Sequence, residues 1–137
     1  MTTYPRLLQT VLDTTDVRGL AEFYRELLGL TYRSGDEPPA AGEPDDADWL
    51  VLRADDGTRQ LAFQGTEVVH RSTWPEPDVP MQLHLDLTVA TVAELEEVRE
   101  RALALGATPL LDRTDDPDEP LHVLADPAGH PFCVFVA

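Results

Sequence analysis

The sequence predicts an α+β fold in a single domain, 1–137, in which two similar halves each contain a strand, a helix and further strands. Residues 9–28 and 84–103 align at an offset of 75 residues. Each half then ends in two strand-like segments joined by a turn that contains Asp and Gly. An internal repeat of this extent is a strong indication of fold. We therefore expect one module over 5–70 and a second over 81–137.

The residues shared by the two aligned segments are mostly apolar and recur at strand or helix spacing. The identical pairs are Leu12 and Leu87, Val17 and Val92, Leu20 and Leu95, Glu22 and Glu97, and Leu28 and Leu103. The closing segments that resemble each other are Trp49–Gln64 and Leu121–Phe135.

Both helices have recognisable ends. The first is predicted over Val17–Leu28, with Thr15 or Asp16 as N-cap and Gly29 just past its end. The second is predicted over Val92–Leu105, where Thr91 and Glu94 form a capping box and Gly106 ends the helix. In each, the apolar residues lie on one face.

Three polar segments separate these elements. Ser34–Asp48 and Asp112–Pro120 are rich in Pro and acidic residues and are predicted to be surface loops. Ser72–Pro80 contains three prolines and suits an extended linker between the halves.

The charge balance narrows the range of partners. Ten basic residues, all arginine, stand against 26 acidic ones, which gives a net charge of −16. Such a field repels nucleic acid and anionic membrane surfaces and attracts cations, although solubility alone also explains it. No apolar run is long enough to span a membrane, no signal peptide is evident, and a single cysteine suits a reducing compartment. We expect a soluble, cytoplasmic protein.

Three segments in order resemble the vicinal oxygen chelate superfamily, which includes glyoxalase I, extradiol dioxygenases, and bleomycin- and fosfomycin-resistance proteins. They are LLQTVLDTTDVRGLAEFYRELLGL (7–30), QLHLDLTVATVAELEEVRERALALGAT (82–108) and LADPAGHPFCVFV (124–136). The resemblance implies two βαβββ modules that form a cupped mixed sheet around a central cavity. It also implies a small-molecule ligand and a homodimer.

The resemblance also identifies where metal-dependent members hold their ion. Their first-strand positions correspond to Gln9 and His84, and the last-strand positions, usually Glu, correspond to Ala62 and Cys133. Two neutral side chains are too few for a divalent ion, so we favour no metal and no other cofactor. If a divalent metal binds, Gln9 and His84 are the expected ligands, with Gln64 and Asp86 as substitutes on the same strand faces.

Among the candidate ligand-binding residues, His84 can contact a ligand, coordinate metal or act as a general base, or simply form a hydrogen-bonded wall of the pocket. Asp86 beside it would raise the pKa of His84 and favour the charged imidazole, or would instead be a buried carboxylate held by backbone donors. Gln9 is expected to be a polar wall residue, with metal ligation as the alternative. We expect Cys133 to behave as a small apolar side chain rather than a nucleophile. The full candidate set is Gln9, Gln64, Trp74, His84, Asp86 and Cys133.

The tryptophans and the remaining histidines are expected in different surroundings. Trp74 lies in the proline-rich linker and is available to stack on a planar ligand, whereas Trp49 is expected in the core. His122 and His130 are expected to be peripheral.

Three functions remain open from the sequence. The first is a non-catalytic protein that sequesters a cationic or aromatic molecule. The second is a metal-dependent lyase or dioxygenase that uses Gln9 and His84, with His84 as the candidate catalytic residue. The third is a domain that mainly mediates assembly.

Overall fold

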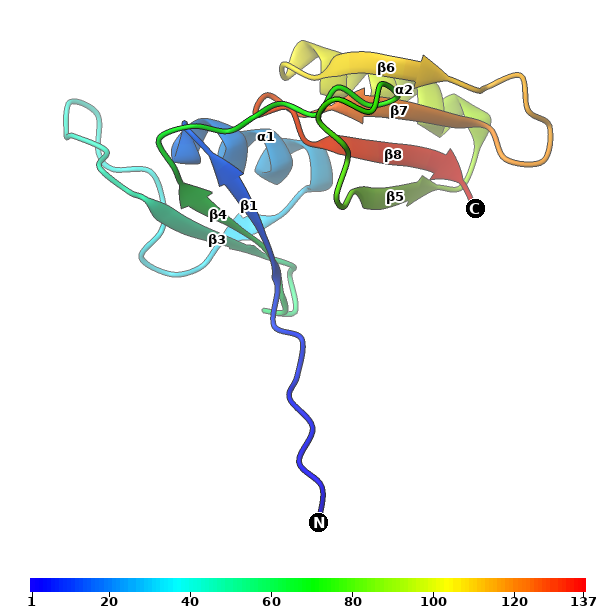
Figure 1. Cartoon of the computed structure of the whole chain (residues 1–137). Helices are drawn as coiled ribbons and strands as arrows, with labels where there is room; N and C mark the ends of the chain where they lie inside the picture. The colour runs from blue at the N-terminus through cyan, green and yellow to red at the C-terminus, as the bar shows by residue number, and fades with distance from the viewer. The chain divides into compact units, whose positions relative to one another are not determined.

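The computed structural model describes residues 1–137, which form two compact units, Met1–Glu67 and Val68–Ala137. Each unit contains a strand, a helix and three more strands, so the predicted α+β class and the βαβββ modules are confirmed (Figure 1). That the two units act as a single domain stays a prediction.

The elements of the first unit are β1 (Thr10–Thr14), α1 (Val17–Leu28), β2 (Thr31–Tyr32), β3 (Trp49–Arg53) and β4 (Arg59–Gly65). Those of the second are β5 (Leu85–Val89), α2 (Val92–Ala104), β6 (Thr108–Asp112), β7 (Leu121–Ala125) and β8 (Pro131–Val136).

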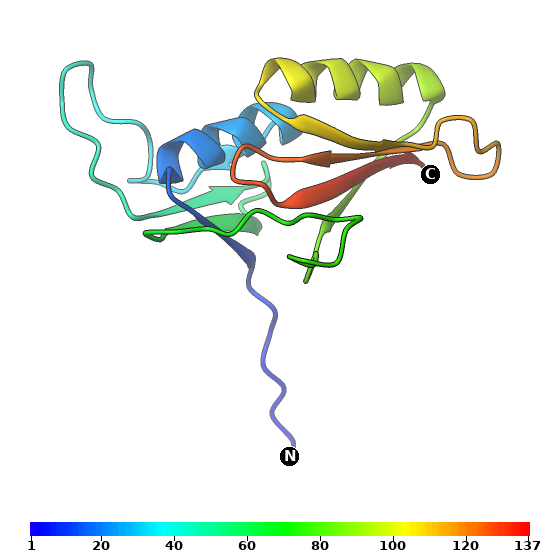
Figure 2. The ribbon, with the colours of Figure 1, turned by 45° about the horizontal axis from the view of Figure 1, so that its top comes forward.

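The two sheets have the same topology. The strand orders are β1-β4-β3-β2 and β5-β8-β7-β6, and in each unit the first strand runs parallel to the last. Parallel neighbours need a crossover connection. Here the connection includes the helix, which lies along one face of its own sheet (Figure 2).

Helix α1 begins and ends where the sequence predicts. Asp16 accepts a hydrogen bond from the Gly19 amide, and Gly29 adopts the left-handed conformation at φ 68°. The helix buries one continuous face against β3 and β4, and Tyr24 stacks on Phe63 with ring centroids 5.9 Å apart. Its buried residues are Val17, Leu20, Ala21, Phe23, Tyr24 and Leu27.

Helix α2 has the predicted capping box, in which Thr91 and Glu94 each bind the other's backbone amide. It ends one residue earlier than predicted, with Leu105 as C-cap and Gly106 at φ 113°. Only Leu95 and Ala102 are fully buried. This helix therefore packs less tightly on its sheet than α1 does.

The strand registers determine which residues face away from the helices. In the first unit, Tyr32 binds Glu22 of α1 with its hydroxyl, and its sheet neighbours Leu52 and Leu61 share that helix-covered face. In the second unit, His122 contacts Glu96 of α2 at 3.0 Å and lies beside Val134. We call the opposite side of each sheet its open face; alternate residues along each strand point to it.

The predicted linker 72–80 is not simply extended: Thr73 donates its amide to Val79, and its hydroxyl accepts from the Val79 amide, which closes a compact turn. The Trp74–Pro75 peptide bond within it is cis.

No helix of the chain has the length and apolar character that crossing a membrane requires.

A polar cluster joins α1 to β2. The Tyr32 hydroxyl donates to Glu22, the Arg25 guanidinium pairs with the same carboxylate, and Arg18 lies 4.9 Å from the Tyr32 ring centroid. Hydrogen bonding from Arg25 lowers the pKa of Glu22. Burial raises the pKa of Tyr32 to about 12.

We expect the free energy of unfolding to fall as the pH rises from 10 to 12, because the unfolded chain loses the Tyr32 proton first. Tyr32→Phe should flatten this slope and remove the phenolate absorbance that appears near pH 12. Tyr4→Phe, at an exposed tyrosine, is the control and should leave the slope unchanged. Chemical denaturation at several alkaline pH values tests this, and an unchanged slope in Tyr32→Phe would contradict it.

Candidate functional site

The open face of the second unit brings together three of the predicted residues. Asp86 of β5 is directly opposite Cys133 of β8, and His84 precedes Asp86 by two residues, just before β5 begins. The His84 Nε2 atom lies 3.1 Å from Asp86 Oδ1. The potential ligand atoms of all three residues lie within 4.8 Å of one another.

These three side chains differ in exposure. His84 and Asp86 are exposed, whereas Cys133 is half-buried. An ion pair at this exposure contributes at most about 1 kcal/mol. Burial raises the pKa of the Cys133 thiol, and the neighbouring Asp86 carboxylate raises it further. A raised pKa lowers the fraction of thiolate, which is the nucleophilic form; that Cys133 behaves as a small apolar side chain stays a prediction.

The open face of the first unit carries a different set of side chains. Val11 of β1 is opposite Ala62, and Asp13 is opposite Gln64. Gln9 precedes Val11 by two residues, so strand alternation assigns it to the same face. Trp49 of β3 pairs with Gln64 across the neighbouring strand. Asp13 is a member of this face that the sequence reasoning missed, although the alternation from Gln9 could have found it.

The side-chain carbonyl oxygen of Gln9 is buried and has no hydrogen-bond partner. A buried acceptor without a donor costs roughly 1–3 kcal/mol, so native structures seldom leave one unpaired. An N–H donor or a cation supplied by a ligand would satisfy it.

The registers support the predicted equivalence of Ala62 and Cys133. Ala62 pairs with Val11 and Cys133 with Asp86, and Val11 and Asp86 are themselves equivalent in the repeat. The open-face positions of β4 and β8 therefore include no carboxylate. The only open-face carboxylates on the first strands are Asp13 and Asp86.

Two expectations about the remaining candidates were wrong. Trp49 is 36% exposed on the open face and does not belong to the core. His122 is not peripheral but 2% exposed, because its strand turns it toward α2, where it contacts Glu96. Trp74 is half-buried, and its amide donates to the Ser72 hydroxyl within the 72–80 turn.

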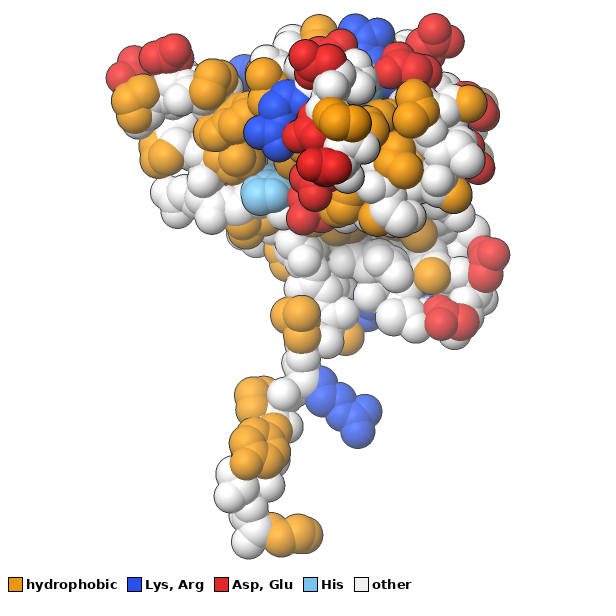
Figure 3. Space-filling model, turned by 90° about the vertical axis from the view of Figure 1, so that its right-hand side faces the viewer, with side chains coloured by type: hydrophobic (Ala, Val, Ile, Leu, Met, Phe, Trp, Pro, Cys, Tyr) orange, Lys and Arg blue, Asp and Glu red, His pale blue; other side chains and the backbone are white.

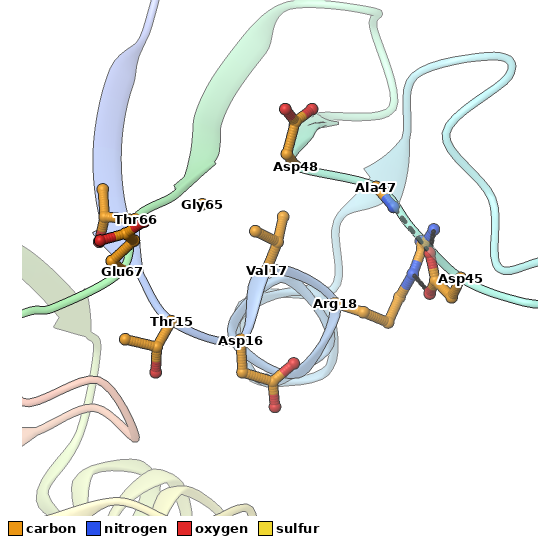
Figure 4. Close-up of a pocket in the computed structure, with 10 residues that line it drawn as sticks. All are labelled: Thr15, Asp16, Val17, Arg18, Asp45, Ala47, Asp48, Gly65, Thr66 and Glu67. Atoms are coloured by element: carbon orange, nitrogen blue, oxygen red, sulfur yellow. Dashed lines mark hydrogen bonds and ion pairs between the residues drawn. The ribbon is translucent and has the colours of Figure 1, made fainter.

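A cavity of about 480 Å³ lies in the first unit, at the start of α1. Its walls come from the β1–α1 turn, the residues before β3 and the end of β4 (Figure 4). None of the predicted site residues lines it. The lining residues are Thr15, Asp16, Val17, Arg18, Asp45, Ala47, Asp48, Gly65, Thr66 and Glu67.

Several charged groups of this cavity already form interactions within the protein. Asp16 caps α1, and Arg18 reaches across to Asp45, with 2.7 Å between Nε and Oδ2. The guanidinium lowers the pKa of the Asp45 carboxyl. Figure 4 shows the carboxylates of Asp16 and Asp48 pointing in opposite directions. The acidic groups therefore do not converge on one point, as a cation site would require.

Comparison with known families and structures identifies similar proteins. A protein-family model described as "Glyoxalase-like domain" matches residues 9–135. No curated protein matches the sequence.

Several solved structures share the fold over nearly the whole chain. An enzyme of the glyoxalase/bleomycin resistance protein/dioxygenase family from Burkholderia phytofirmans PsJN has a TM-score of 0.67 and 15% identity, covering 94% of this chain and 96% of that one. A possible glyoxalase from Bacillus cereus has a TM-score of 0.62 and 16% identity, with coverages of 94% and 96%. The fosfomycin resistance protein FosX from Listeria monocytogenes, complexed with Mn(II) and sulfate, has a TM-score of 0.66 and 13% identity, with coverages of 98% and 94%.

We expect Arg18 to hold the acidic loop against α1. It donates to Asp45 and to the backbone carbonyls of Asp36 and Glu37. Arg18→Gln should therefore speed amide hydrogen exchange in residues 36–47 by roughly two- to fivefold, since surface ion pairs add only modest stability. Mass spectrometry of exchanged peptides measures this. Arg59→Gln, at a residue without an ion pair in the structure, should leave the loop unchanged; equal effects of the two variants would refute the role of Arg18.

Proposed function

Because this chain belongs to the glyoxalase-like domain family, we propose that it binds a small cationic or aromatic molecule at the open faces of its sheets, without the standard metal site of metal-dependent relatives. The proposed contact residues are Gln9 and Gln64 in the first unit and Trp74, His84, Asp86 and Cys133 in the second.

The observation that carries this proposal is the unpaired carbonyl oxygen of Gln9. An oxygen only accepts hydrogen bonds, so its missing partner is a donor or a cation. The exposed Asp86 carboxylate favours a ligand of the same kind. The net charge of −16 adds long-range attraction for cations. These features together support a ligand with positive charge or N–H groups.

Trp49, in addition to Trp74, supports the binding of an aromatic ligand. Trp49 is exposed on the open face next to Gln64, where an indole ring can stack on a planar ligand. An exposed aromatic side chain on a sheet face that combines apolar and polar groups is typical of a ligand-binding surface.

The metal implied by the fold family does not fit the standard positions of this chain. The Listeria FosX structure contains Mn(II), an ion that prefers carboxylate, carbonyl and water oxygens. At the two last-strand positions this chain has Ala62 and Cys133, which supply no such oxygen. The unpaired carbonyl oxygen of Gln9 and the imidazole of His84 do not complete that site by themselves.

A second candidate function is a metal-dependent lyase or dioxygenase that uses Gln9 and His84. One specific observation favours it: Asp86 and Cys133 lie close enough to His84 to add further ligands. Activity that depends on an added divalent metal and disappears in His84→Ala would favour this candidate over a binding protein.

We also expect a homodimer. The first nine residues lie before β1, and several of their apolar side chains are uncovered, including Leu7, which is 93% exposed (Figure 3). Strand β1 is itself an edge strand with an unpaired side. Exposed apolar residues beside an open edge are typical of an association surface. Light scattering coupled to size exclusion should give twice the mass of 15.2 kDa, and a mass of one chain would refute the expectation.

The ligand proposal predicts selectivity by charge. Isothermal titration of the chelator-treated protein should show binding of ethidium or metal-free bleomycin, both cationic and aromatic, and none of fosfomycin, which is anionic. Gln9→Ala should weaken binding by roughly 10- to 100-fold, the range for a lost hydrogen bond to a charged group.

The control for this experiment is Glu100→Ala on α2, which removes one negative charge from an exposed site away from the open face. Glu100→Ala should change the affinity for the cationic compounds little, because local contacts outweigh the long-range effect of one surface charge. Absence of heat for both cationic compounds, or binding that Gln9→Ala leaves intact, would contradict the proposed role of Gln9.

A further inference from the structure

Arg113 lies directly after β6 and projects from the open face of the second unit. Its amide donates to the Leu121 carbonyl at 2.9 Å, and its own carbonyl accepts from the Leu121 amide at 3.5 Å. This exchange of two hydrogen bonds extends the antiparallel pairing of β6 with β7 by one residue. Residues directly opposite in such a pair share one face of the sheet. Because His122 points toward α2, its neighbour Leu121 and the paired Arg113 belong to the open face.

The register places opposite charges at the two edges of this face. The strands lie side by side in the order β6, β7, β8 and β5 (Figure 1). Neighbouring strands are about 4.8 Å apart, so the backbones of the two edges are separated by roughly 14 Å. Arg113 stands at the β6 edge and Asp86 at the β5 edge, with mostly apolar residues between them. The two rows across the face are Arg113, Leu121, Phe135 and Thr88, and Leu111, Val123, Cys133 and Asp86.

The charged groups at both edges are accessible. Arg113 is exposed, and its guanidinium forms no ion pair or hydrogen bond in the structure. The Asp86 side chain is 58% exposed and contacts His84 through one of its two oxygens. Both charges act on the middle of the face: burial and the Asp86 carboxylate raise the pKa of Cys133, and the positive charge of Arg113 opposes them.

We propose that Arg113 binds the carboxylate of a zwitterionic ligand whose positively charged group lies at Asp86. The apolar or aromatic body of this ligand lies between the two charges, over Leu121 and Phe135. A guanidinium donates two parallel hydrogen bonds to a carboxylate, so Arg113 also fixes the orientation of the ligand. The ligand class is therefore an amino carboxylate with its charges separated by an apolar body. This assignment rests on the proposed function and deepens it.

The alternative explanation is that Arg113 only offsets the charge of the acidic segment 112–120. Glu119 of that segment also acts on Cys133 electrostatically, yet it forms no ion pair with Arg113. The two explanations predict opposite effects of a carboxylate on the ligand. The net charge of −16 repels an added negative charge and weakens binding, unless Arg113 receives that charge directly.

Isothermal titration of the chelator-treated full chain with two matched compounds tests the proposal. One is 4′-(aminomethyl)biphenyl-4-carboxylate, a zwitterion, and the other is its carboxamide, which keeps the amine and the rings but has no negative charge. We expect the zwitterion to bind about tenfold more tightly, the lower end of the range for a hydrogen bond to a charged group. Arg113→Gln should remove this advantage and leave the affinity for the carboxamide unchanged. Asp86→Asn should weaken the binding of both compounds.

Arg99→Gln is the matched control, since it removes the same charge in the same unit from α2, on the other side of the sheet. It should leave the ratio of the two affinities unchanged. Circular dichroism checks that each variant folds, and Arg113→Ala is a second variant without the guanidinium.

Two results would overturn the role of Arg113 while the proposed function stands: a carboxamide that binds as tightly as the zwitterion, or an advantage of the zwitterion that survives Arg113→Gln. Absence of binding by both compounds would also overturn it. A parallel titration with ethidium then shows whether the proposed function fails as well.

Discussion

The parallel pairing of the first strand with the last strand in each unit is the constraint on which the other features depend. Every side chain of a strand alternates between two faces, so the register decides which residues meet the helix and which face away. Val11 opposite Ala62 and Asp86 opposite Cys133 set these registers. A slip by one residue would bury Asp86 under α2 and expose Leu87 in its place.

The helices fix this register, because they cover the strand face on which the apolar side chains alternate. The two helices differ in how many of their own residues they bury. Helix α1 buries six residues and adds the ring contact between Tyr24 and Phe63, whereas α2 buries two. The second unit also places His122 between sheet and helix, where it needs Glu96 as a partner. Helix α1 thus covers its sheet with a larger buried surface than α2 does, and only the second unit places a histidine between sheet and helix.

The two open faces have diverged in chemistry while the backbone pattern is shared. The first carries amides, apolar groups and the Asp13 carboxylate, and the buried amide oxygen of Gln9 there lacks a partner. The second carries an imidazole, a carboxylate and a thiol within one small cluster. The amide oxygen of Gln9 needs an N–H donor or a cation as its partner, and the exposed Asp86 carboxylate is complementary to positive charge.

The sequence by itself determined the repeat, the helix ends and the α+β class, because caps, helical periodicity and duplicated segments act over short distances along the chain. Asp16, Gly29 and the Thr91–Glu94 capping box all lie where their local chemistry predicts. It also identified His84, Asp86 and Cys133 as candidates. Only the tertiary structure showed that these three cluster, because β5 and β8 are more than 40 residues apart in the chain and meet only through sheet pairing.

Dependence on long-range strand pairing also explains why the positions expected for Trp49 and His122 are wrong. Trp49 and His122 were misplaced because hydrophobicity and position near a turn do not reveal which face of a sheet a residue occupies. That face is decided by pairing with strands elsewhere in the chain: the register of β3 with β4 places Trp49 on the open side, and the register of β7 with β8 turns His122 toward α2. Local chemistry therefore sets the elements of this protein, and long-range pairing decides which of its side chains are available to bind.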